Sequence, residues 1–310
     1  MTGKTLRITL ETVTPLLLYG ADVKTPELRP PAFRGAMRYW WRAALGGIIG
    51  DKNLEGLHKL ERAVFGDTEH GSPISLRIGA SDLGKTEVYL LPHKNKVKRE
   101  GLEGTFELVL SQPRHDDVLI WDAACASLEL ALTFGGVGQR SRRGYGTLRI
   151  VEASNGKVKA FPTTRHGWVA HVKRTGARAV DTAARFVIAY KVLPNRVENL
   201  ANYPCATNAG LIRLCDLKAY SAMDAVRQFM HRVPKNDALG RIGSKERQKK
   251  RQASSLWARP IQTGSSYGLL CTVLTSDFRG ADYECVRDFL DRFSGEYLKV
   301  KGWNRWPKQS

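Results

Sequence analysis

A segment rich in glycine and arginine, residues 135–146, separates two apolar stretches and constrains the fold of the first half of the chain. It reads GGVGQRSRRGYG and contains no acidic residue. Residues 120–134 before it form an apolar, helix-like run, and residues 147–151 after it have the pattern of a strand. Packed elements should therefore hold both ends of this Gly/Arg loop. The alternative is a flexible turn, but a plain turn rarely needs so many residues.

The composition of the Gly/Arg loop predicts a phosphate-binding site. Glycine tolerates positive φ and lets the backbone approach a ligand closely, so bare amide groups can cradle a phosphate. Arginine adds charge and forked hydrogen-bond donors. A tyrosine ring can stack on a base. The binding residues predicted in this loop are Gly136, Gly138, Arg140, Arg142, Arg143, Gly144 and Tyr145.

The charge of the whole chain indicates a polyanionic partner. The 310 residues include 49 lysines and arginines against 30 acidic residues, for a formal net charge of +19 and a pI of about 9.9. Such a balance is typical of nucleic-acid-binding domains, although charge alone does not choose among RNA, DNA and an anionic membrane. The sequence has no apolar run long enough to span a membrane and no apolar core of a signal peptide. We therefore expect no membrane partner.

Cysteine usage predicts a reducing compartment. The five cysteines are odd in number, and most lie within apolar segments, so we expect buried free thiols and a cytoplasmic location. Their spacings match no zinc pattern. No metal site and no cofactor are predicted.

Residues 32–45 have the pattern of an amphipathic helix with a basic row. At 100° per residue, one face carries apolar side chains that should pack on a sheet, namely Phe33, Met37, Trp40 and Ala44. Another face carries Arg34, Arg38 and Arg42, with Trp41 beside them. Like charges one turn apart weaken a helix, and no acidic residue lies between Arg34 and Gly50. The row therefore predicts a positive strip for an anionic partner, with a solvated helix face as the alternative.

The order of elements in the first half predicts a ferredoxin-like domain. Strands are expected at 6–13, 74–78, 87–91, 105–110 and 147–151, with helices at 32–45, 54–65 and 120–134. Apart from insertions this is a β-α-β-β-α-β order, which RNA-recognition modules also use.

The second half is less regular. Helices are expected at 181–192, 219–232 and 283–293, with a strand at 267–274. This alternation is consistent with a second domain of the same kind. The predicted fold class is α+β, with two tandem ferredoxin-like (RRM-like) domains with insertions, at residues 1–160 and 161–310.

A second basic cluster spans residues 234–260. It has eight basic and two acidic residues, and we expect a mobile loop that orders on a polyanion. A loop that only aids solubility is the alternative. The predicted binding residues are Lys249, Lys250, Arg251 and Arg259. For a shorter basic run, residues 93–99, a binding role and a solvated hairpin tip are equally good interpretations.

Histidines leave a catalytic alternative open. His166 and His171 lie near Arg165, Lys173 and Arg174, and a metal-independent ribonuclease needs a general base and cationic stabilisation of the phosphate. Ordinary surface histidines are the simpler interpretation. No HExxH, GxSxG or P-loop motif occurs.

Two stretches together resemble a known superfamily. The run FRGAMRYWWR at residues 33–42, following TPL at 14–16, resembles the first-helix motif of the RAMP proteins of CRISPR systems. The Gly/Arg loop resembles the glycine-rich loop of the same proteins. The form of the helix motif looks most like the subunit-one family of the Cmr effector complex, type III-B. Residues 251–261 are similar to a second-domain motif of that family, although SSL stands at 254–256 where SPL is commoner.

The resemblance implies a non-catalytic RNA-binding subunit of an RNA-guided effector ribonucleoprotein. Such a subunit would cap the filament near the 3′ part of the guide RNA and bind guide and target RNA beside other effector subunits. The residues named above would then be RNA-binding residues. A histidine-dependent, metal-independent CRISPR-RNA endoribonuclease and a protein–protein adaptor are the two alternatives.

Overall fold

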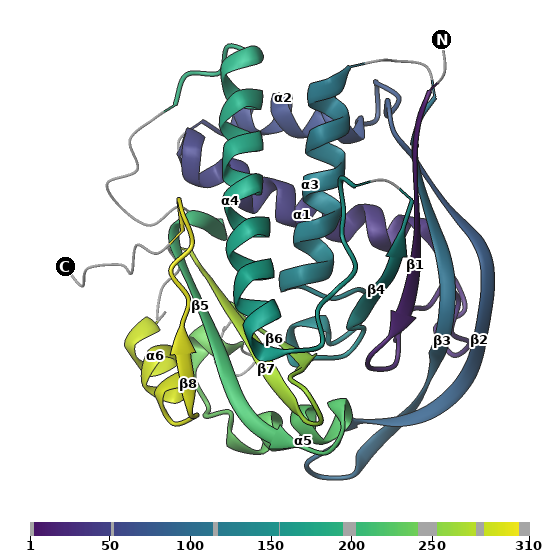
Figure 1. The fold of residues 1–310 in the computed structure, drawn as a ribbon, viewed down its shortest axis with the longest axis vertical. Coiled ribbons are helices and arrows are strands. Elements are labelled where there is room, and N and C mark those ends of the chain that lie inside the picture. Colours follow the sequence, from purple (N-terminus) through teal and green to yellow (C-terminus); the bar gives the residue numbers. More distant parts are fainter. Residues whose placement is uncertain are drawn as a thin grey trace, which may run out of the picture.

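The chain folds into two four-stranded antiparallel sheets with a group of helices between and above them (Figure 1). The computed structural model describes residues 3–50, 53–113, 117–154, 156–194, 203–240, 253–276 and 282–303.

The first sheet has the strand order β2-β3-β1-β4. Its strands are β1 (Lys4–Thr12), β2 (Ser75–Leu91), β3 (Lys96–Gln112) and β4 (Leu148–Ala153). Its helices are α1 (Pro30–Ile49), α2 (Leu54–Phe65) and α3 (Val118–Phe134). With α2 as an insertion, this is the β-α-β-β-α-β arrangement expected from the sequence.

The second sheet repeats the topology with the order β6-β7-β5-β8. Its strands are β5 (Cys205–Ala219), β6 (Leu256–Gln262), β7 (Tyr267–Thr275) and β8 (Gly295–Tyr297). Helix α5 (Ala222–Arg232) follows β5, and α6 (Tyr283–Asp291) precedes β8. The long helix α4 (Arg165–Ala189) connects the two parts. The α+β class with two ferredoxin-like units is therefore confirmed, and the boundary at residues 160 and 161, between β4 and α4, stays a prediction.

The apolar face predicted for α1 is confirmed as part of the core. Phe33, Met37, Trp40 and Ala44 are each at most 1% exposed. Phe33 meets Phe106 of β3 edge to face, with ring centres 5.8 Å apart. This contact fixes α1 on the first sheet, because aromatic pairs prefer such offset geometry.

Helix α3 lies between α1 and α4 and is buried on all sides (Figure 1). A helix that is apolar all round needs such an environment. It begins at Asp117, whose carboxylate accepts hydrogen bonds from the amides of Leu119 (2.8 Å) and Ile120 (3.1 Å).

Four expectations for secondary structure were wrong in extent. The strand expected at 105–110 begins at Lys96 and runs to Gln112 as β3. The strands expected at 74–78 and 87–91 form the single strand β2, whose register shifts between Ile78 and Ser81. The helix expected at 181–192 begins sixteen residues earlier, at Arg165, because many basic residues obscure its apolar face. Residues 256–260, assigned to a mobile basic loop, belong to β6, whose residues are almost all buried.

Aromatic side chains join the two sheets. Trp40 of α1 lies 5.4 Å from Trp257 of β6, measured between ring centres. Near the C-terminus, Trp303 stacks on Phe134 at 5.0 Å and donates a hydrogen bond to the carbonyl of Gly176 at 3.2 Å. Both halves therefore contribute to one apolar core.

The five cysteines are free thiols, and four of them are buried. Burial raises the pKa of Cys125 to about 12, so this thiol stays protonated and unreactive. In the described part of the chain, no helix is both long and apolar enough to cross a membrane.

Candidate nucleic-acid interface

The Gly/Arg loop is a tight turn with several residues in left-handed conformations. Gly138 has φ of 92°, and a β-carbon there would lie 2.7 Å from the carbonyl oxygen of Leu17, so glycine is required. Arg140 has φ of 57° and precedes a 3₁₀ turn at Ser141–Arg143. Gly144, with φ of 90°, ends that turn.

The backbone amides of the loop divide into two groups. The amides of Val137, Gln139 and Gly146 donate hydrogen bonds of 2.9 Å to carbonyls of the loop itself or of residues 15 and 17. The amides of Gly138 and Arg140 have no acceptor among the residues that the structure describes. Gly138 and Gln139 are exposed. The exposed part of the loop thus retains free donors of the kind that bind phosphate.

Two of the three loop arginines hold the second half of the protein. The guanidinium of Arg142 donates to the carbonyl of Ser254 and lies 4.9 Å from the ring centre of Trp257. Arg143 donates to the carbonyl of Leu239, and burial together with the charges of its arginine neighbours lowers its pKa to about 10. In this structure both guanidinium groups contact the protein itself, which the sequence did not predict.

The third arginine, Arg140, lies among basic residues from other parts of the chain. Burial lowers the pKa of His93, in the β2–β3 turn, and the nearby charges of Lys94, His231 and Arg140 lower it further. Burial raises the pKa of the Tyr145 hydroxyl to about 12, and the nearby charges of Arg140 and Arg227 partly oppose this rise. We call Arg140, His93, Lys94, Arg227 and His231 the Arg140 cluster. No salt bridge to a carboxylate is found for its arginines and lysine within the described ranges.

Apart from Arg140, the four members of the Arg140 cluster were not among the predicted binding residues. His93 is half-buried, and Lys94, Arg227 and His231 are exposed. Arg227 and His231 are spaced four residues apart on α5, so they share one helix face, and Lys94 belongs to the basic run at 93–99. The four-residue spacing on α5 is visible in the sequence, but the proximity of these two side chains to the Gly/Arg loop depends on how the two halves pack.

The aromatic residues predicted to stack on bases are buried. Trp41 has no exposed surface and meets Phe186 of α4 edge to face at 5.5 Å. Tyr145 is also fully buried and donates its hydroxyl to the carbonyl of Tyr89. In this structure neither ring is open to a base, so we correct the prediction of base stacking for both.

The basic row on α1 has a carboxylate partner on the next helix, outside residues 34–50. Glu61 of α2 is buried and accepts from Arg38 at 2.5 Å and from Arg42 at 3.2 Å. Arg34 points to the carbonyl of Ile74 at 3.5 Å, and burial and the charge of Arg38 lower its pKa. The row is therefore partly neutralised.

The second basic cluster is only partly described. Lys249, Lys250 and Arg251 lie outside the described residues. Arg259 is 2% exposed, and its Nη2 group donates to the carbonyl of Leu148. Its guanidinium is thus a buried group between the two sheets and not part of a surface loop, as had been expected.

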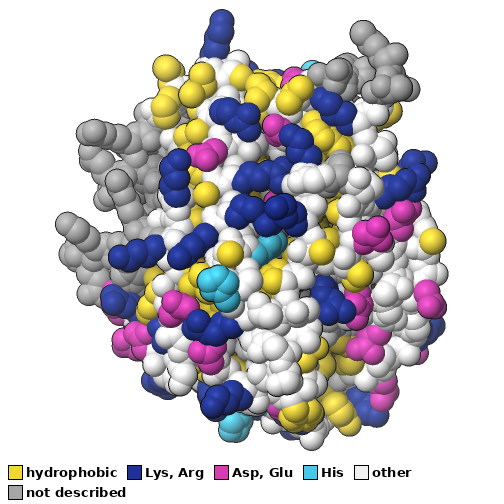
Figure 2. Space-filling model, in the orientation of Figure 1, with side chains coloured by type: hydrophobic (Ala, Val, Ile, Leu, Met, Phe, Trp, Pro, Cys, Tyr) yellow, Lys and Arg dark blue, Asp and Glu magenta, His cyan; other side chains and the backbone are white. Residues whose placement is uncertain are grey.

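Lysine and arginine side chains also gather over the middle of the face that carries α4 (Figure 2). Several of these charges are paired with acidic residues of α3. Glu129, which is 1% exposed, accepts from Arg174 at 2.8 Å and from Arg178 at 3.0 Å. Asp122 accepts from Lys157 at 2.8 Å. The two pairs with Glu129 fasten α4 to α3, the pair with Asp122 fastens the β4–α4 connection to α3, and all of them reduce the net charge of the face.

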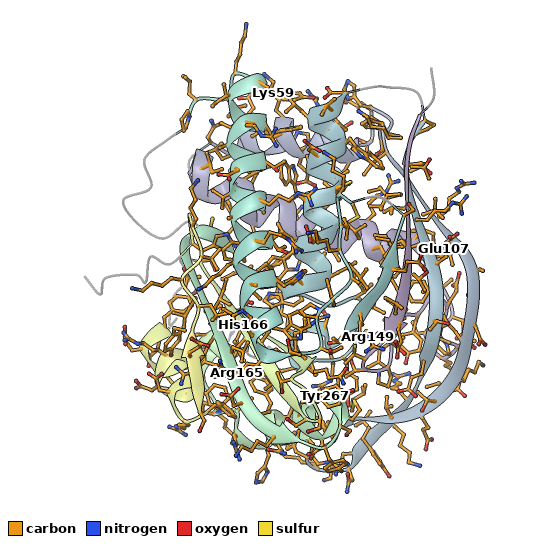
Figure 3. All side chains as sticks on the ribbon, in the orientation of Figure 1. Lys59, Glu107, Arg149, Arg165, His166 and Tyr267 are labelled. Atoms are coloured by element: carbon orange, nitrogen blue, oxygen red, sulfur yellow. The ribbon has the colours of Figure 1, made fainter. Side chains whose placement is uncertain are left out.

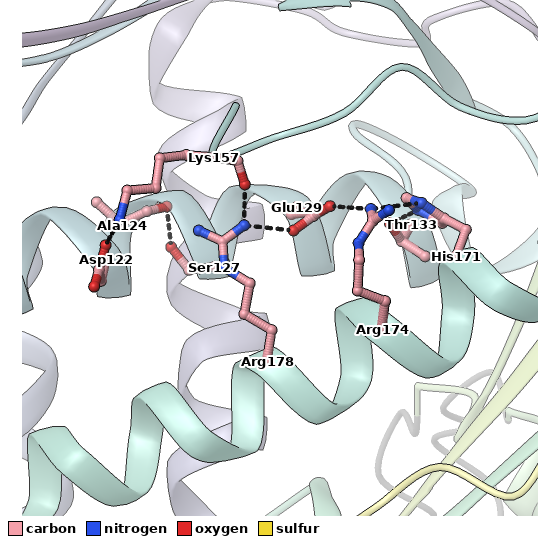
Figure 4. A network of polar contacts seen from close by, with 9 residues as sticks. All are labelled: Asp122, Ala124, Ser127, Glu129, Thr133, Lys157, His171, Arg174 and Arg178. Carbon is pink, nitrogen blue, oxygen red and sulfur yellow. Dashed lines mark hydrogen bonds and ion pairs between the residues drawn. The ribbon is translucent and has the colours of Figure 1, made fainter. Parts of the chain in front are cut away.

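The two histidines of the catalytic alternative lie in different environments. His166 is exposed at the start of α4 (Figure 3). His171 is buried between α3 and α4 (Figure 4). Arg174 donates to its Nδ1 atom at 3.0 Å, so Nε2 carries the proton and donates to Thr133 at 2.9 Å. Burial and two nearby arginines lower the pKa of His171 to about 3. A buried, neutral imidazole of this kind is not placed to exchange protons with an RNA.

No group of three or more His, Cys, Asp or Glu side chains in the described part of the chain is arranged to hold a metal ion.

Comparison with known proteins gives consistent matches. The family model of the RAMP superfamily matches residues 9–149. The CRISPR system Cmr subunit Cmr1-2 of Pyrococcus furiosus is 30% identical over 176 residues, which are 46% of this chain and 92% of that protein. Cmr1-1 of the same organism is 29% identical over 181 residues, and the match covers 52% of each chain.

Solved structures share the fold over almost the whole chain. The apo crystal structure of Cmr1 from Pyrococcus furiosus has a TM-score of 0.67 at 18% identity and covers 97% of this chain and 100% of that one. A chain of the type III-B Cmr-beta complex bound to cognate target RNA has a TM-score of 0.55 at 14% identity, covering 94% and 99%. Because Cmr1-2 is matched over nearly its full length at 30% identity, this chain belongs to the Cmr subunit 1 family of the RAMP superfamily.

Proposed function

We propose that this protein is a non-catalytic RNA-binding subunit of a type III-B CRISPR (Cmr) effector ribonucleoprotein. Two findings support the proposal: membership of the Cmr subunit 1 family, and a fold shared with a chain of Cmr-beta, a complex solved with its cognate target RNA. In this role its partners are guide RNA, target RNA and other effector subunits. The protein caps the filament near the 3′ part of the guide RNA and works in the cytoplasm.

The observation that carries RNA binding is the Arg140 cluster. The amides of exposed Gly138 and half-buried Arg140 have no acceptor among the described residues, and Lys94 and Arg227 add positive charge from two other segments. Amides and cations together bind phosphate more strongly than either does alone. The cluster is therefore suited to the backbone of an RNA strand.

The proposed RNA contacts differ from the set expected from the sequence. Gly138 and Arg140 remain, and Lys94, Arg227 and His231 join them. Arg142 and Arg143 hold the second half of the protein in place, while Gly136 and Gly144 are buried and shape the loop. Contacts to phosphate carry no sequence information, so this surface should bind RNA with weak sequence preference. The contributions of Lys249, Lys250 and Arg251 stay predictions.

The test is RNA affinity after charge reversal in the Arg140 cluster. Labelled single-stranded RNA is titrated with wild-type protein and with the double variant Lys94→Glu, Arg140→Glu, and binding is followed by fluorescence anisotropy. The control is Lys59→Glu, an exposed lysine at the end of the molecule opposite α5 (Figure 3). The double variant should bind at least about tenfold more weakly, because two phosphate contacts are lost. Equal affinity of the double variant and the control would refute the assignment.

The same complexes separate binding from cleavage. After incubation with and without EDTA, the RNA is run on a denaturing gel and should remain intact in both. Cleavage that persists in EDTA and is lost in His166→Ala would replace this proposal with a histidine-dependent endoribonuclease.

A further inference from the structure

Basic side chains gather over α4 on the face of the molecule that Figure 2 shows. Six basic residues of α4 and of the segment before it form this group, of which five are exposed and one is half-buried. We call the group the α4 surface; it comprises Lys157, Lys159, Lys173, Arg174, Arg178 and Arg185. The acidic residue of α4 itself, Asp181, is paired with Lys301 at 3.4 Å, so it does not neutralise the α4 surface.

The carboxylates that pair with the α4 surface lie beneath it. Asp122 and Glu129 of α3 are 7% and 1% exposed. Together they pair with four members of the α4 surface, at distances from 2.8 to 3.6 Å. The other two members, Lys159 and Lys173, form no ion pair in the described structure. Six positive charges minus two negative charges leave a net charge of +4, and both negative charges are buried.

Glu129 holds two guanidinium groups of the α4 surface in place (Figure 4). Its Oε1 atom accepts from Nη2 of Arg174 at 2.8 Å, and its Oε2 atom accepts from Nη1 of Arg178 at 3.0 Å. The second terminal nitrogen of each arginine has no acceptor among the described residues, and the two side chains are 39% and 25% exposed. Four residues separate them, a rise of about 6 Å along the helix axis. Cations that are already held in place lose little side-chain freedom when they bind an anion.

The chemistry of the α4 surface fits a polyanion better than a protein partner. The cores of protein–protein interfaces are depleted in lysine and enriched in aromatic residues. From residue 157 to residue 185, all of which the structure describes, no large apolar side chain is exposed. Between Lys173 and Arg185 the helix rises about 18 Å. Positive charges spread along one helix suit the repeating phosphates of a nucleic-acid strand.

We propose that the α4 surface binds the phosphate backbone of a second stretch of single-stranded RNA. That the nucleic acid is RNA rests on the proposed function, whereas the site itself rests on residues outside the Arg140 cluster. Figure 1 shows α4 across the middle of the molecule and α5, which carries two members of the Arg140 cluster, at its lower end. The two basic surfaces therefore hold different stretches of RNA.

Two lysines of the α4 surface allow a test that leaves the fold intact. Lys159→Glu with Lys173→Glu reverses both charges without breaking an ion pair, so the thermal midpoint should equal that of the wild type. The control is Arg287→Glu with Arg292→Glu, two exposed arginines in α6 and directly after it. This control changes the net charge by the same amount. A labelled single-stranded RNA that is long enough to reach both basic surfaces is titrated with the full-length protein, and binding is followed by fluorescence anisotropy.

The Lys159→Glu, Lys173→Glu variant should bind this RNA about tenfold more weakly than the wild type, because two phosphate contacts are lost. Its logarithmic salt slope should be smaller by about 1.4, at about 0.7 for each contact to a single strand. The control variant should stay within about twofold of the wild type, because salt screens exposed charges far from the strand. Equal RNA affinities of the two variants would refute the proposal.

The variant of the Arg140 cluster, Lys94→Glu with Arg140→Glu, separates this proposal from the proposed function. If RNA affinity falls in that variant alone, the α4 surface is not a contact and the Arg140 cluster stands. If it falls in Lys159→Glu, Lys173→Glu alone, the α4 surface stands and the assignment of the Arg140 cluster fails. When both surfaces contact the RNA, the quadruple variant should lose affinity by the product of the two separate factors, because distant sites act independently.

Assembly with other effector subunits decides against the alternative of a protein contact. The Lys159→Glu, Lys173→Glu variant should still assemble with these subunits. A variant that binds RNA as the control does but no longer assembles would make the α4 surface a protein contact and overturn the proposal.

Discussion

Arg142 of the Gly/Arg loop lies over the ring of Trp257 in β6, with the guanidinium carbon 4.9 Å from the ring centre. The same guanidinium lies 5.3 Å from the ring of Tyr39 on α1. One arginine thus joins the first half, the loop and the second sheet. Its carbonyl contact at Ser254 adds a hydrogen bond to these cation–π contacts.

Removing this arginine should cost stability more than RNA affinity. Arg142→Met should lower the free energy of unfolding by about 1–3 kcal/mol, because a charged hydrogen bond and cation–π contacts are lost. Urea denaturation measures this change. Arg140→Met is the matched control and should unfold like the wild type, because the Arg140 side chain has no hydrogen bond or ion pair among the described residues. The opposite pattern, with Arg142→Met stable but unable to bind RNA, would restore Arg142 as a phosphate contact.

RNA binding should depend steeply on salt, and the Arg140 cluster should account for part of that dependence. The logarithm of the binding constant falls linearly with the logarithm of salt concentration, by about 0.7 for each phosphate contact to a single strand. Arg140→Met should reduce this slope by about one contact. Anisotropy titrations across a series of potassium chloride concentrations provide the measurement. A slope equal to that of the wild type would show that Arg140 does not contact the strand.

Burial of His171 predicts loss of stability in mild acid. Its pKa is about 3 in the folded protein, below the ordinary value of about 6.5. The unfolded state therefore binds more protons between these values, and stability falls as pH drops from about 6.5 toward 3. The slope from this residue is at most about 1.4 kcal/mol per pH unit. Urea midpoints of the wild type and His171→Gln, compared from pH 7 to pH 4, should converge as pH falls. Parallel curves would mean that His171 is not buried neutral.

Loss of the shared carboxylate on α2 should destabilise α1. Glu61→Gln keeps the shape of the side chain but leaves Arg38 and Arg42 without their partner. Breaking this partly buried pair should cost about 1–3 kcal/mol. The thermal midpoint measures the effect, and Glu69→Gln, an exposed acid outside this pair, is the control. Equal midpoints for the two variants would contradict a structural role for Glu61.

The first half of the fold could be predicted because its pattern is local. Strand β1 alternates apolar and polar residues, and α3 is mostly apolar and begins at a capping aspartate. The second half could not be predicted to the same degree. Register shifts near Cys205 and Cys215 interrupt the pattern of β5, and β8 has only three residues. Because Arg259 is charged, the sequence placed it in a basic surface loop, although in the structure its side chain is buried in β6.

The surroundings of the individual site residues could not be predicted from the sequence. The sequence singled out the Gly/Arg loop, but it contained no signal for which of its arginines would be held by the second half of the protein. That depends on carbonyl groups more than ninety positions away, at Leu239 and Ser254. In the same way, the partner of Arg38 and Arg42 lies on the next helix, so a search along one helix could not find it.

The position of Lys94, Arg140 and Arg227 on three separate elements has a thermodynamic consequence. Lys94 and Arg140 belong to the first half and Arg227 to the second, so the complete surface exists only while the two halves are docked. An RNA strand that contacts all three residues would therefore span both halves of the protein. By linkage, docking must raise RNA affinity by the same factor by which RNA favours docking. If RNA contacts all three residues, as proposed, its binding is linked to how firmly the two sheets are held together, and a partner that senses their docking would respond to RNA.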